Sequence, residues 1–274
     1  MKHILRDYPC SPQGSLKGPE LGEWEYCYQD EKHILNLACQ IKERNNAVCL
    51  KLPFDDYVEA EVFGAQVDRS DKIPKIRYKV ENSRNIIQGI GLSEVAPINQ
   101  ILKAVKLSRE EPLILQVQAP FSILAYLIEP MVLFKKLLRN PEDVKNSLYN
   151  IEKFLEGYIK SAIENGADII SISDPCASVE LLGEENYRIY SATPIVHLLQ
   201  QIEPWLDKSM IHLCPRCSSL LEQLGLFRRE TFEIDQKDLQ KALISISQNP
   251  SIHFTGHQCI HKSFASKIHL LSLA

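Results

Sequence analysis

The segment Asp168–Ser173, with the sequence DIISIS, decides which fold class this chain is expected to adopt. It is apolar, or nearly so, at both alternating sets of positions, and so is Leu113–Gln118, LILQVQ. A strand with one solvent-exposed face alternates apolar and polar residues, whereas a strand buried on both faces does not. These two segments are therefore predicted to be buried strands of a parallel sheet.

A long amphipathic stretch, Glu142–Glu164, leads into the strand at Asp168–Ser173. Pro141 opens it and Gly166 follows its end. Proline suits the first helical position because the N–H it lacks would be unpaired there, and glycine suits the left-handed residue that ends many helices. This pattern predicts a helix that packs beside the strand it precedes.

Short β-rich segments and longer amphipathic segments alternate along the rest of the chain, with no hairpin signal between them. This order predicts parallel strands in an α/β fold, here a (β/α)8 barrel of the TIM type. The remaining strand candidates are Ala47–Leu52, Met210–Leu213, Thr231–Ile234 and Ile252–Thr255. The remaining helix candidates are Glu31–Arg44, Glu94–Leu107, Ile123–Leu138, Glu184–Ile202, Ser218–Leu224 and Gln236–Ser247.

The number of strands is low for a barrel. Six segments are convincing strands, and Ile73–Tyr78 is a candidate edge strand or hairpin. We therefore expect one domain over residues 1–274, with a barrel that is incomplete or distorted.

Composition excludes several classes of function. The 274 residues carry a formal net charge of -4, so there is no electrostatic reason to expect nucleic acid as a partner. Residues 1–14 lack the apolar core of a signal peptide, and no stretch reaches the roughly 18 apolar residues of a membrane helix. We expect a cytoplasmic protein that binds neither nucleic acid nor a membrane.

The chain contains eight cysteines. Disulfides are rare in a reducing cytosol, so the choice is among buried thiols, metal ligands and redox centres. Cys39 and Cys49 lie in apolar patterns and are expected to be core residues. The others of interest lie at or just beyond the ends of strand-like segments: Cys176, Cys214, Cys217 and Cys259.

The segment Met210–Cys217, MIHLCPRC, carries the clearest candidate for a metal site. Side chains alternate along a strand, so His212 and Cys214 share a face and lie roughly 6.6–7 Å apart, close enough to hold one tetrahedral zinc ion. The next two strand ends bring further possible ligands to the same edge of the sheet: Glu233 and Asp235, then Cys259.

The same residues have other interpretations. Cys214 and Cys217 form a CxxC pair, which also occurs in structural zinc knuckles and in thiol redox centres. A knuckle needs a second pair of ligands, and His257 with His261 is the only nearby candidate. Strand packing without any metal is a further explanation of the His-x-Cys pair.

A zinc ion with sulfur-rich ligands favours one kind of chemistry. Two thiolates donate electron density to the metal and make it a poor source of hydroxide, whereas a substrate thiol bound at an open position loses its proton near neutral pH. Hydrolytic zinc sites use mainly histidine and carboxylate ligands. This ligand set therefore predicts alkyl transfer to sulfur.

The chain resembles the uroporphyrinogen decarboxylase superfamily, and within it the methylcobamide:coenzyme M methyltransferases. The resemblance runs from about Ala47 to Cys259. It rests on the segments LPFD at 52–55, VEAE at 58–61, FGA at 63–65, APF at 119–121, NGADIISISDPCAS at 165–178 and HLC at 212–214, and on the late Cys259.

This resemblance implies a barrel enzyme in which a zinc-bound thiol, such as coenzyme M, attacks the methyl group of a methylcorrinoid. The methyl donor in that family is carried by a separate small corrinoid protein. His212, Cys214 and Cys259 match the family's zinc ligands, and the fourth, a carboxylate, corresponds to Asp235 or Glu233. We prefer Asp235, which lies 21 residues after Cys214, near the interval usual in the family.

Two further carboxylates match positions in the family's motifs. Asp174 stands in the Asp-Pro motif at a strand end, where it would orient substrate or corrinoid or, alternatively, cap the helix that follows. Asp55 occupies the place of an acidic residue that handles pyrrole nitrogens in the decarboxylases, and here it is expected to line the cavity. The arginine-rich N-terminal motif of the decarboxylases is absent, so decarboxylation is not expected.

The departures from the family leave a second hypothesis open. The family is longer by roughly one βα unit before the last cysteine, Pro215 replaces the usual glycine, and the last cysteine lies in GHQC. A shortened barrel of this kind is also consistent with a non-catalytic member that binds a corrinoid protein or a tetrapyrrole. Neither the acceptor nor the oligomeric state follows from the sequence.

Overall fold

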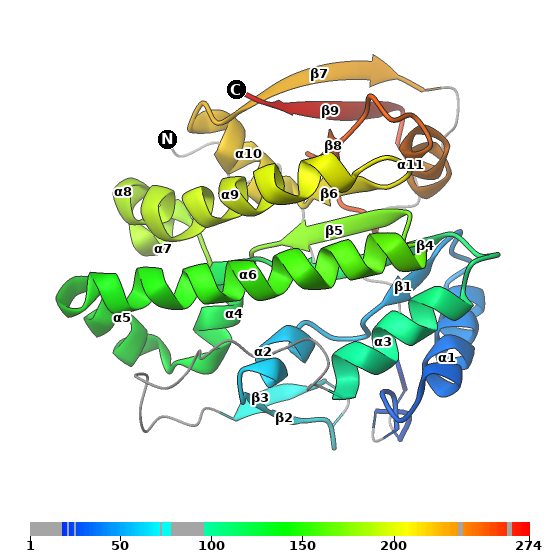
Figure 1. Ribbon diagram of the computed structural model, residues 1–274, viewed down its shortest axis with the longest axis horizontal. Helices are drawn as coiled ribbons and strands as arrows, with labels where there is room; N and C mark the ends of the chain where they lie inside the picture. Colours follow the sequence, from blue (N-terminus) through cyan, green and yellow to red (C-terminus); the bar gives the residue numbers. More distant parts are fainter. Residues whose placement is uncertain are drawn as a thin grey trace.

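The computed structural model describes residues 18–20, 22–24, 26–71, 73–77, 96–234, 238–261 and 265–274 (Figure 1). Its strands are β1 (Leu50–Leu52), β2 (Gln66–Asp68), β3 (Lys75–Arg77), β4 (Leu113–Gln118), β5 (Ile169–Ser173), β6 (Met210–Leu213), β7 (Phe227–Glu233), β8 (Phe254–Thr255) and β9 (Lys267–Leu273). Its α-helices are α1 (Glu31–Arg44), α2 (Val58–Val62), α3 (Ala96–Leu107), α4 (Pro120–Leu127), α5 (Pro130–Arg139), α6 (Pro141–Asn165), α7 (Val179–Leu182), α8 (Glu184–Tyr187), α9 (Thr193–Ile202), α10 (Pro215–Gln223) and α11 (Leu239–Ser247). A π-helical turn, η4 (Arg188–Ala192), joins α8 to α9, and a short 3-10 helix, η5 (Glu203–Trp205), follows α9.

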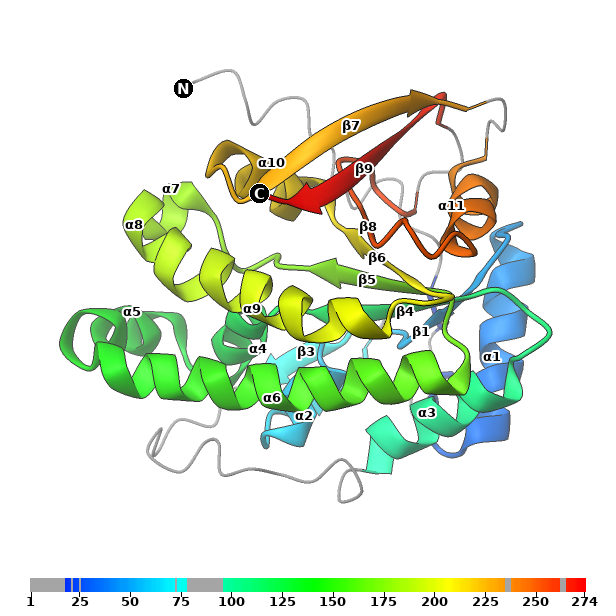
Figure 2. The same ribbon diagram turned by 45° about the horizontal axis from the view of Figure 1, so that its top comes forward.

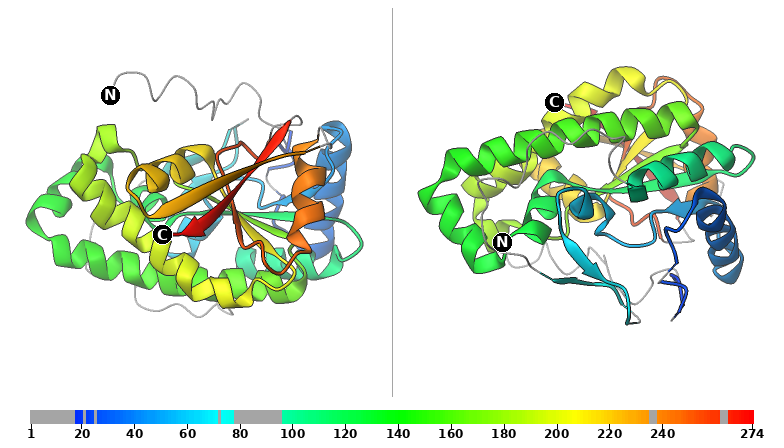
Figure 3. Two further views of the ribbon diagram at one scale, coloured as in Figure 1. Left: turned by 90° about the horizontal axis from the view of Figure 1, so that it is seen from above. Right: turned by 60° about the horizontal axis from the view of Figure 1, so that its bottom comes forward.

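Seven strands form one sheet in the order β1-β4-β5-β6-β8-β9-β7. The first five of these are parallel, whereas β9 pairs antiparallel with both β8 and β7. Figure 3 shows β7 and β9 side by side, crossing above the other strands. Within the described part of the chain β1 and β7 are the two ends of the sheet, so these strands make an open, mostly parallel sheet and not a closed barrel.

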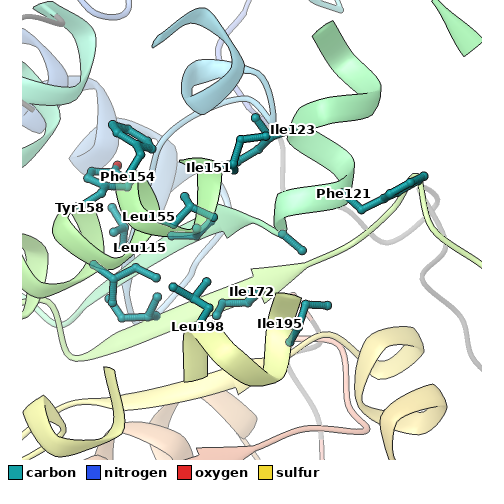
Figure 4. Close-up of a cluster of buried hydrophobic side chains, with 14 of the residues drawn as sticks. Leu115, Phe121, Ile123, Ile151, Phe154, Leu155, Tyr158, Ile172, Ile195 and Leu198 are labelled. Atoms are coloured by element: carbon teal, nitrogen blue, oxygen red, sulfur yellow. The ribbon is translucent and has the colours of Figure 1, made fainter. Parts of the chain in front are cut away.

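One face of the sheet, here called the outer face, is covered by helices. The helices α1, α3, α6 and α9 precede β1, β4, β5 and β6 in the chain, and each contacts the next (Figure 2). Figure 4 shows side chains of β4 and β5, among them Leu115 and Ile172, packed against Leu155 of α6 and Leu198 of α9. Burying these side chains is the main stabilising contribution to the fold, at about 25 cal/mol for each Å² removed from water.

The opposite face of the parallel strands, here called the inner face, is apolar at one end only. Ile114, Ile169 and Met210 are aligned by the strand register and pack with Leu239 and Leu243 of α11. Gln240 of α11 accepts hydrogen bonds from the backbone N–H groups of residues 48 and 49 and donates one to the carbonyl of residue 260. Helix α11 therefore closes the amino-terminal end of the inner face, beside β1.

Several sequence predictions are confirmed here. Helix α6 begins at Pro141, and its cap Gly166 has a φ of 105°, in the left-handed region where glycine carries no steric penalty. Strands β4 and β6 have the bounds expected for them. Among the described helices, including the 25-residue α6, none combines the length and the apolar character that crossing a membrane requires.

Other expectations were wrong in detail. The helix expected over Ile123–Leu138 is two helices, because Pro130 starts α5 after the chain leaves α4 at Ile128. The expectation that all strands are parallel fails at β9, an alternating segment that the pattern analysis missed. The segment expected over Ile73–Tyr78 supplies β3, which pairs with β2 in a separate antiparallel pair.

Strand β7 differs from the buried parallel strands. Only its first residue, Phe227, is buried, and the other six are exposed, including charged side chains at positions 228, 229, 230 and 233. It is the last strand of the seven in the sheet.

Candidate functional site

The carboxyl-terminal half of the inner face is polar. Strand register aligns four polar residues across β4, β5, β6 and β8: Gln116, Ser171, His212 and Thr255. On β4, β5 and β6 the polar residue lies two positions after the residue of the apolar layer. In α/β folds of this kind, ligands bind at the carboxyl ends of the parallel strands. The inner face therefore combines a packed apolar base with a row of hydrogen-bonding groups at the end where a ligand is expected.

His212 is buried at the centre of this row, with 2% of its surface exposed. Its Nδ1 lies 3.0 Å from Ser171 Oγ, and its Nε2 lies 2.8 Å from the backbone carbonyl of Gln258. Since a carbonyl only accepts, Nε2 carries the proton and Nδ1 accepts from the serine. Burial lowers the pKa of the ring to about 4, so His212 is neutral at pH 7.

The loop 256–261, with the sequence GHQCIH, brings Cys259 next to His212. Gly256 is required at its start, because a Cβ there would lie 2.7 Å from Ser218 Cβ and 2.8 Å from Leu271 Cδ1. His257 follows with a φ of 63°, a left-handed conformation that is rare outside glycine. Its Nδ1 lies 3.1 Å from Ser219 Oγ, and its backbone N–H donates to Ser218 Oγ at 2.8 Å. These contacts fix the loop whose next carbonyl accepts from His212.

A second polar group lies where β1 ends, on the same face. The amides of Gln116 and Gln118 both donate to Asp56 Oδ1. Lys51 Nζ lies 3.5 Å from His261 Nε2, and Asp56 and Cys259 act on it electrostatically. Burial lowers the pKa of Lys51 and raises that of Asp56, and it lowers the pKa of His261 to about 3. None of these three residues was singled out as catalytic from the sequence.

The predicted metal ligands are only partly brought together. His212 contacts the backbone carbonyl of Gln258, the residue directly before Cys259. Cys214 is the N-cap residue of α10, and its half-buried side chain packs against the outer core. Among the residues that the structure describes, no three histidine, cysteine, aspartate or glutamate side chains are placed to hold one metal ion. Nε2 of His212 points at a carbonyl, so the ring offers a metal no free nitrogen on that side. The predicted ligands among the described residues are therefore not gathered around one point, and their role in holding zinc stays a prediction.

The two carboxylates predicted to complete the metal shell have different outcomes. Asp235 lies outside the described residues. Glu233 is at the end of β7, where its side chain is 73% exposed and forms a salt bridge of 3.0 Å with Lys267. The CxxC pair consists of free thiols, and burial of Cys217 raises its pKa well above the ordinary value.

Asp174 is buried behind the strand ends, with 3% of its surface exposed. Ser122 and Ser191 donate to its two carboxylate oxygens. Burial raises its pKa to about 6 despite these hydrogen bonds. The helix that follows is capped by Ser178, whose side chain accepts from the backbone of residue 181, so capping is not what Asp174 does here.

Asp55 lies in an ion-pair cluster beside the site. Its Oδ2 accepts from Arg69 Nε at 2.9 Å and from the Tyr28 hydroxyl at 3.3 Å, while Arg69 also binds both oxygens of Glu61. The adjacent Asp56, not Asp55, joins the polar row described above. The sequence signal that could have distinguished them is the alternation of two glutamines, Gln116 and Gln118, on the strand facing Asp56.

Comparison with known families identifies the chain at this point. The family model of uroporphyrinogen decarboxylase (URO-D) matches residues 20–256. The chain belongs to the URO-D family.

Similar proteins within and around this family include methyltransferases and decarboxylases. The methylcobamide:CoM methyltransferase MtbA of Methanosarcina acetivorans is 28% identical over 228 residues, which cover 78% of this chain and 66% of that protein. The methylated-thiol–coenzyme M methyltransferase of Methanosarcina mazei is 25% identical, over 77% of this chain and 59% of its own length. The uroporphyrinogen decarboxylase of Aquifex aeolicus is 27% identical, over 66% of this chain and 51% of its own. The chain thus spans less than two thirds of the length of each of these relatives.

Among solved structures, a methyltransferase from Methanosarcina mazei has a similar fold. The TM-score is 0.62 at 19% sequence identity, with 73% of this chain and 63% of that chain covered. At this identity the likeness concerns the fold alone. It supports an α/β architecture of the URO-D family with a mostly parallel sheet.

Proposed function

We propose that this chain transfers a methyl group from a corrinoid, carried by a small partner protein, to a thiol acceptor. The proposal is supported by the similarity to three methyltransferases whose names include coenzyme M. The structural observation that carries it is the position of the His212 ring against the loop that holds Cys259, at the carboxyl ends of the parallel strands. The acceptor thiol would bind there.

The reaction needs the acceptor as a thiolate. Its sulfur forms the new S–CH3 bond, and the electron pair of the broken Co–C bond stays with the corrinoid. A nearby cation lowers the pKa of a thiol and so raises the thiolate fraction. Lys51 supplies a positive charge on this face, while neutral His212 and Ser171 form a fixed hydrogen-bonded wall.

The proposal includes a zinc ion held by three side chains of the chain and by one carboxylate. His212, Cys214 and Cys259 remain the predicted ligands, with Asp235 or Glu233 as the predicted fourth. A zinc ion bound there would activate the acceptor thiol. Since the described side chains do not gather at one point, ligation would require the loop 256–261 to release the His212 ring.

The test is metal content together with methyl transfer. Purified wild type is expected to hold about one zinc per chain and to demethylate methylcobalamin in the presence of coenzyme M, followed by the change in corrinoid absorbance. Cys259→Ser is expected to lose both, and Cys39→Ser, a half-buried thiol on α1, is the matched control that keeps both. Full zinc and full activity in Cys259→Ser would refute the proposal.

A second function is favoured by the same geometry. The engagement of both His212 nitrogens by protein groups, and the spread of the possible metal ligands, suit a family member that binds a corrinoid protein or a tetrapyrrole without turnover. This alternative predicts metal-free protein that binds cobalamin in equilibrium dialysis and leaves methylcobalamin intact when a thiol is added.

A further inference from the structure

A groove runs between the helices α6 and α9, which lie side by side in Figures 1 and 2 and pack against each other. Two hollows of about 320 Å³ and 360 Å³ lie along this α6–α9 groove, and both are lined by Tyr149, Glu152 and His197. Buried side chains of both helices, Leu148 and Leu198, supply apolar lining. None of the lining residues belongs to the candidate site at the strand ends, so the groove is a separate surface.

Glu152 is a mostly buried carboxylate that both hollows share. Its side chain is only 13% exposed. Of the described basic side chains, only that of His197 comes within 4.0 Å, and its Nδ1, at 3.9 Å, is too distant for a hydrogen bond. Burial raises the pKa of Glu152 to about 7, despite the positive charge of Lys153, so the protein itself stabilises the ionised carboxylate poorly.

The lysines that line the groove are paired with other carboxylates. Lys145 donates to Glu142 at 2.8 Å. Lys153 donates to Glu156 at 2.9 Å. Glu152 is therefore the carboxylate in this groove that is left to pair with a cation from outside.

The surroundings of Glu152 suit a cation that has an apolar stem. The ring of Tyr149 is 56% exposed, and aromatic faces attract cations. Ile189 and Pro194 add apolar surface in the larger hollow. The lining residues of α6 run from position 145 to position 156, which is roughly 16 Å of helix, or about five residues of an extended chain.

We infer that the α6–α9 groove binds an extended segment of a partner protein that places an arginine side chain against Glu152. Apolar side chains of the segment would lie along the groove on either side of the arginine. A guanidinium group suits this place better than an ammonium group, because it binds a carboxylate through two N–H groups and stacks on an aromatic ring. A protein segment suits it better than a small molecule, because two connected hollows follow the helices in place of one enclosed pocket. This inference does not rest on the proposed methyl transfer.

Fluorescence polarisation of labelled five-residue peptides tests the inference. The probe is Ala-Leu-Arg-Leu-Ala, and its neutral counterpart has glutamine in place of arginine. Wild type is expected to bind the arginine peptide at least tenfold more tightly than the glutamine peptide, and Glu152→Gln is expected to bind both equally. Glu164→Gln removes an exposed carboxylate of the same helix that does not line the groove, so it should keep the full preference.

Three results would overturn the inference. The first is equal affinity of wild type for the two peptides. The second is an arginine preference that persists in Glu152→Gln, with circular dichroism showing a folded protein, since another carboxylate would then bind the guanidinium. The third is competition by free arginine amide as strong as that by the unlabelled peptide, which would make the groove a site for a small cation.

Discussion

Asp55 and Asp56 are neighbours in the chain and belong to two clusters of opposite character. The Arg69 cluster consists of Arg69, Asp55, Glu61 and Tyr28, and the Lys51 cluster consists of Lys51, Asp56, His261, Gln116 and Gln118. In the first, each charged side chain contacts a partner of opposite charge. In the second, the cation and the carboxylate each contact neutral groups instead.

This difference separates a charge used for the fold from a charge available for a ligand. A cation that is paired with two carboxylates has no free capacity, and removing it leaves both carboxylates unpaired. A cation that contacts only neutral groups has no ion pair to offset the desolvation that accompanies its burial. Three substitutions test this distinction on stability.

The largest effect is expected for Arg69→Met. It leaves Asp55, a nearly buried carboxylate, and Glu61 without their cation, and breaking such a pair costs about 3 kcal/mol. Urea denaturation followed by circular dichroism measures the loss. Arg77→Met breaks the exposed pair with Asp68 and should cost less than about 1 kcal/mol. Equal losses in the two variants would remove the basis of the comparison.

A smaller, pH-dependent effect is expected for Glu59→Gln. Burial, with a minor contribution from Asp56 and Asp55, raises the pKa of Glu59 to about 8. A folded pKa above the unfolded value means that stability is full below about pH 4.5 and falls as the pH rises toward 8. Glutamine stays neutral, so this variant should become progressively more stable than wild type as the pH rises from about 4.5 to about 8.5, with no gain near pH 4.5.

Denaturation midpoints of Glu59→Gln and wild type across this range give the test. The exposed Glu164→Gln should follow the wild-type curve at every pH. A difference between Glu59→Gln and wild type that does not change with pH would show that Glu59 titrates normally.

The smallest effect on stability is expected for Lys51→Met. Replacing an unpaired cation by an apolar side chain of similar length removes a desolvation cost and breaks no salt bridge, so the change should lie between zero and a gain of about 1 kcal/mol. Thermal unfolding without added anions would detect it. A loss comparable with that of Arg69→Met would mean that Lys51 is paired within the protein after all.

Most of the parallel core, but less of the candidate site, could be predicted from the sequence. Segments such as LILQVQ and DIISIS are apolar enough on both faces to define buried strands, and Pro141 with Gly166 marks the ends of α6. The boundary at Pro130 and the antiparallel β9 were missed, since neither a helix break nor the direction of a strand follows from periodicity. The resemblance to the URO-D family was visible in short motifs and is confirmed.

The site was harder because its partners are distant in the chain. The contact of His212 with the carbonyl of Gln258 spans 46 residues, and that of Lys51 with His261 spans 210. Spacing along a strand predicts that His212 and Cys214 share a face, but it contains no information about which loop crosses them. The sequence likewise does not indicate that Asp56 binds Gln116 and Gln118 while its neighbour Asp55 pairs with Arg69, because only the fold shows which way each carboxylate faces.

Strand β7 has a consequence for the behaviour of the protein in solution. A last strand offers a row of backbone N–H and C=O groups to any other extended chain, which is a common route to aggregation. Along β7 the exposed side chains include Arg228, Arg229, Glu230 and Glu233. Charges of both signs on so short a segment make pairing with a stray strand unfavourable in most registers. The exposed side chains of β7 itself thus disfavour the pairing of another strand with this edge of the sheet.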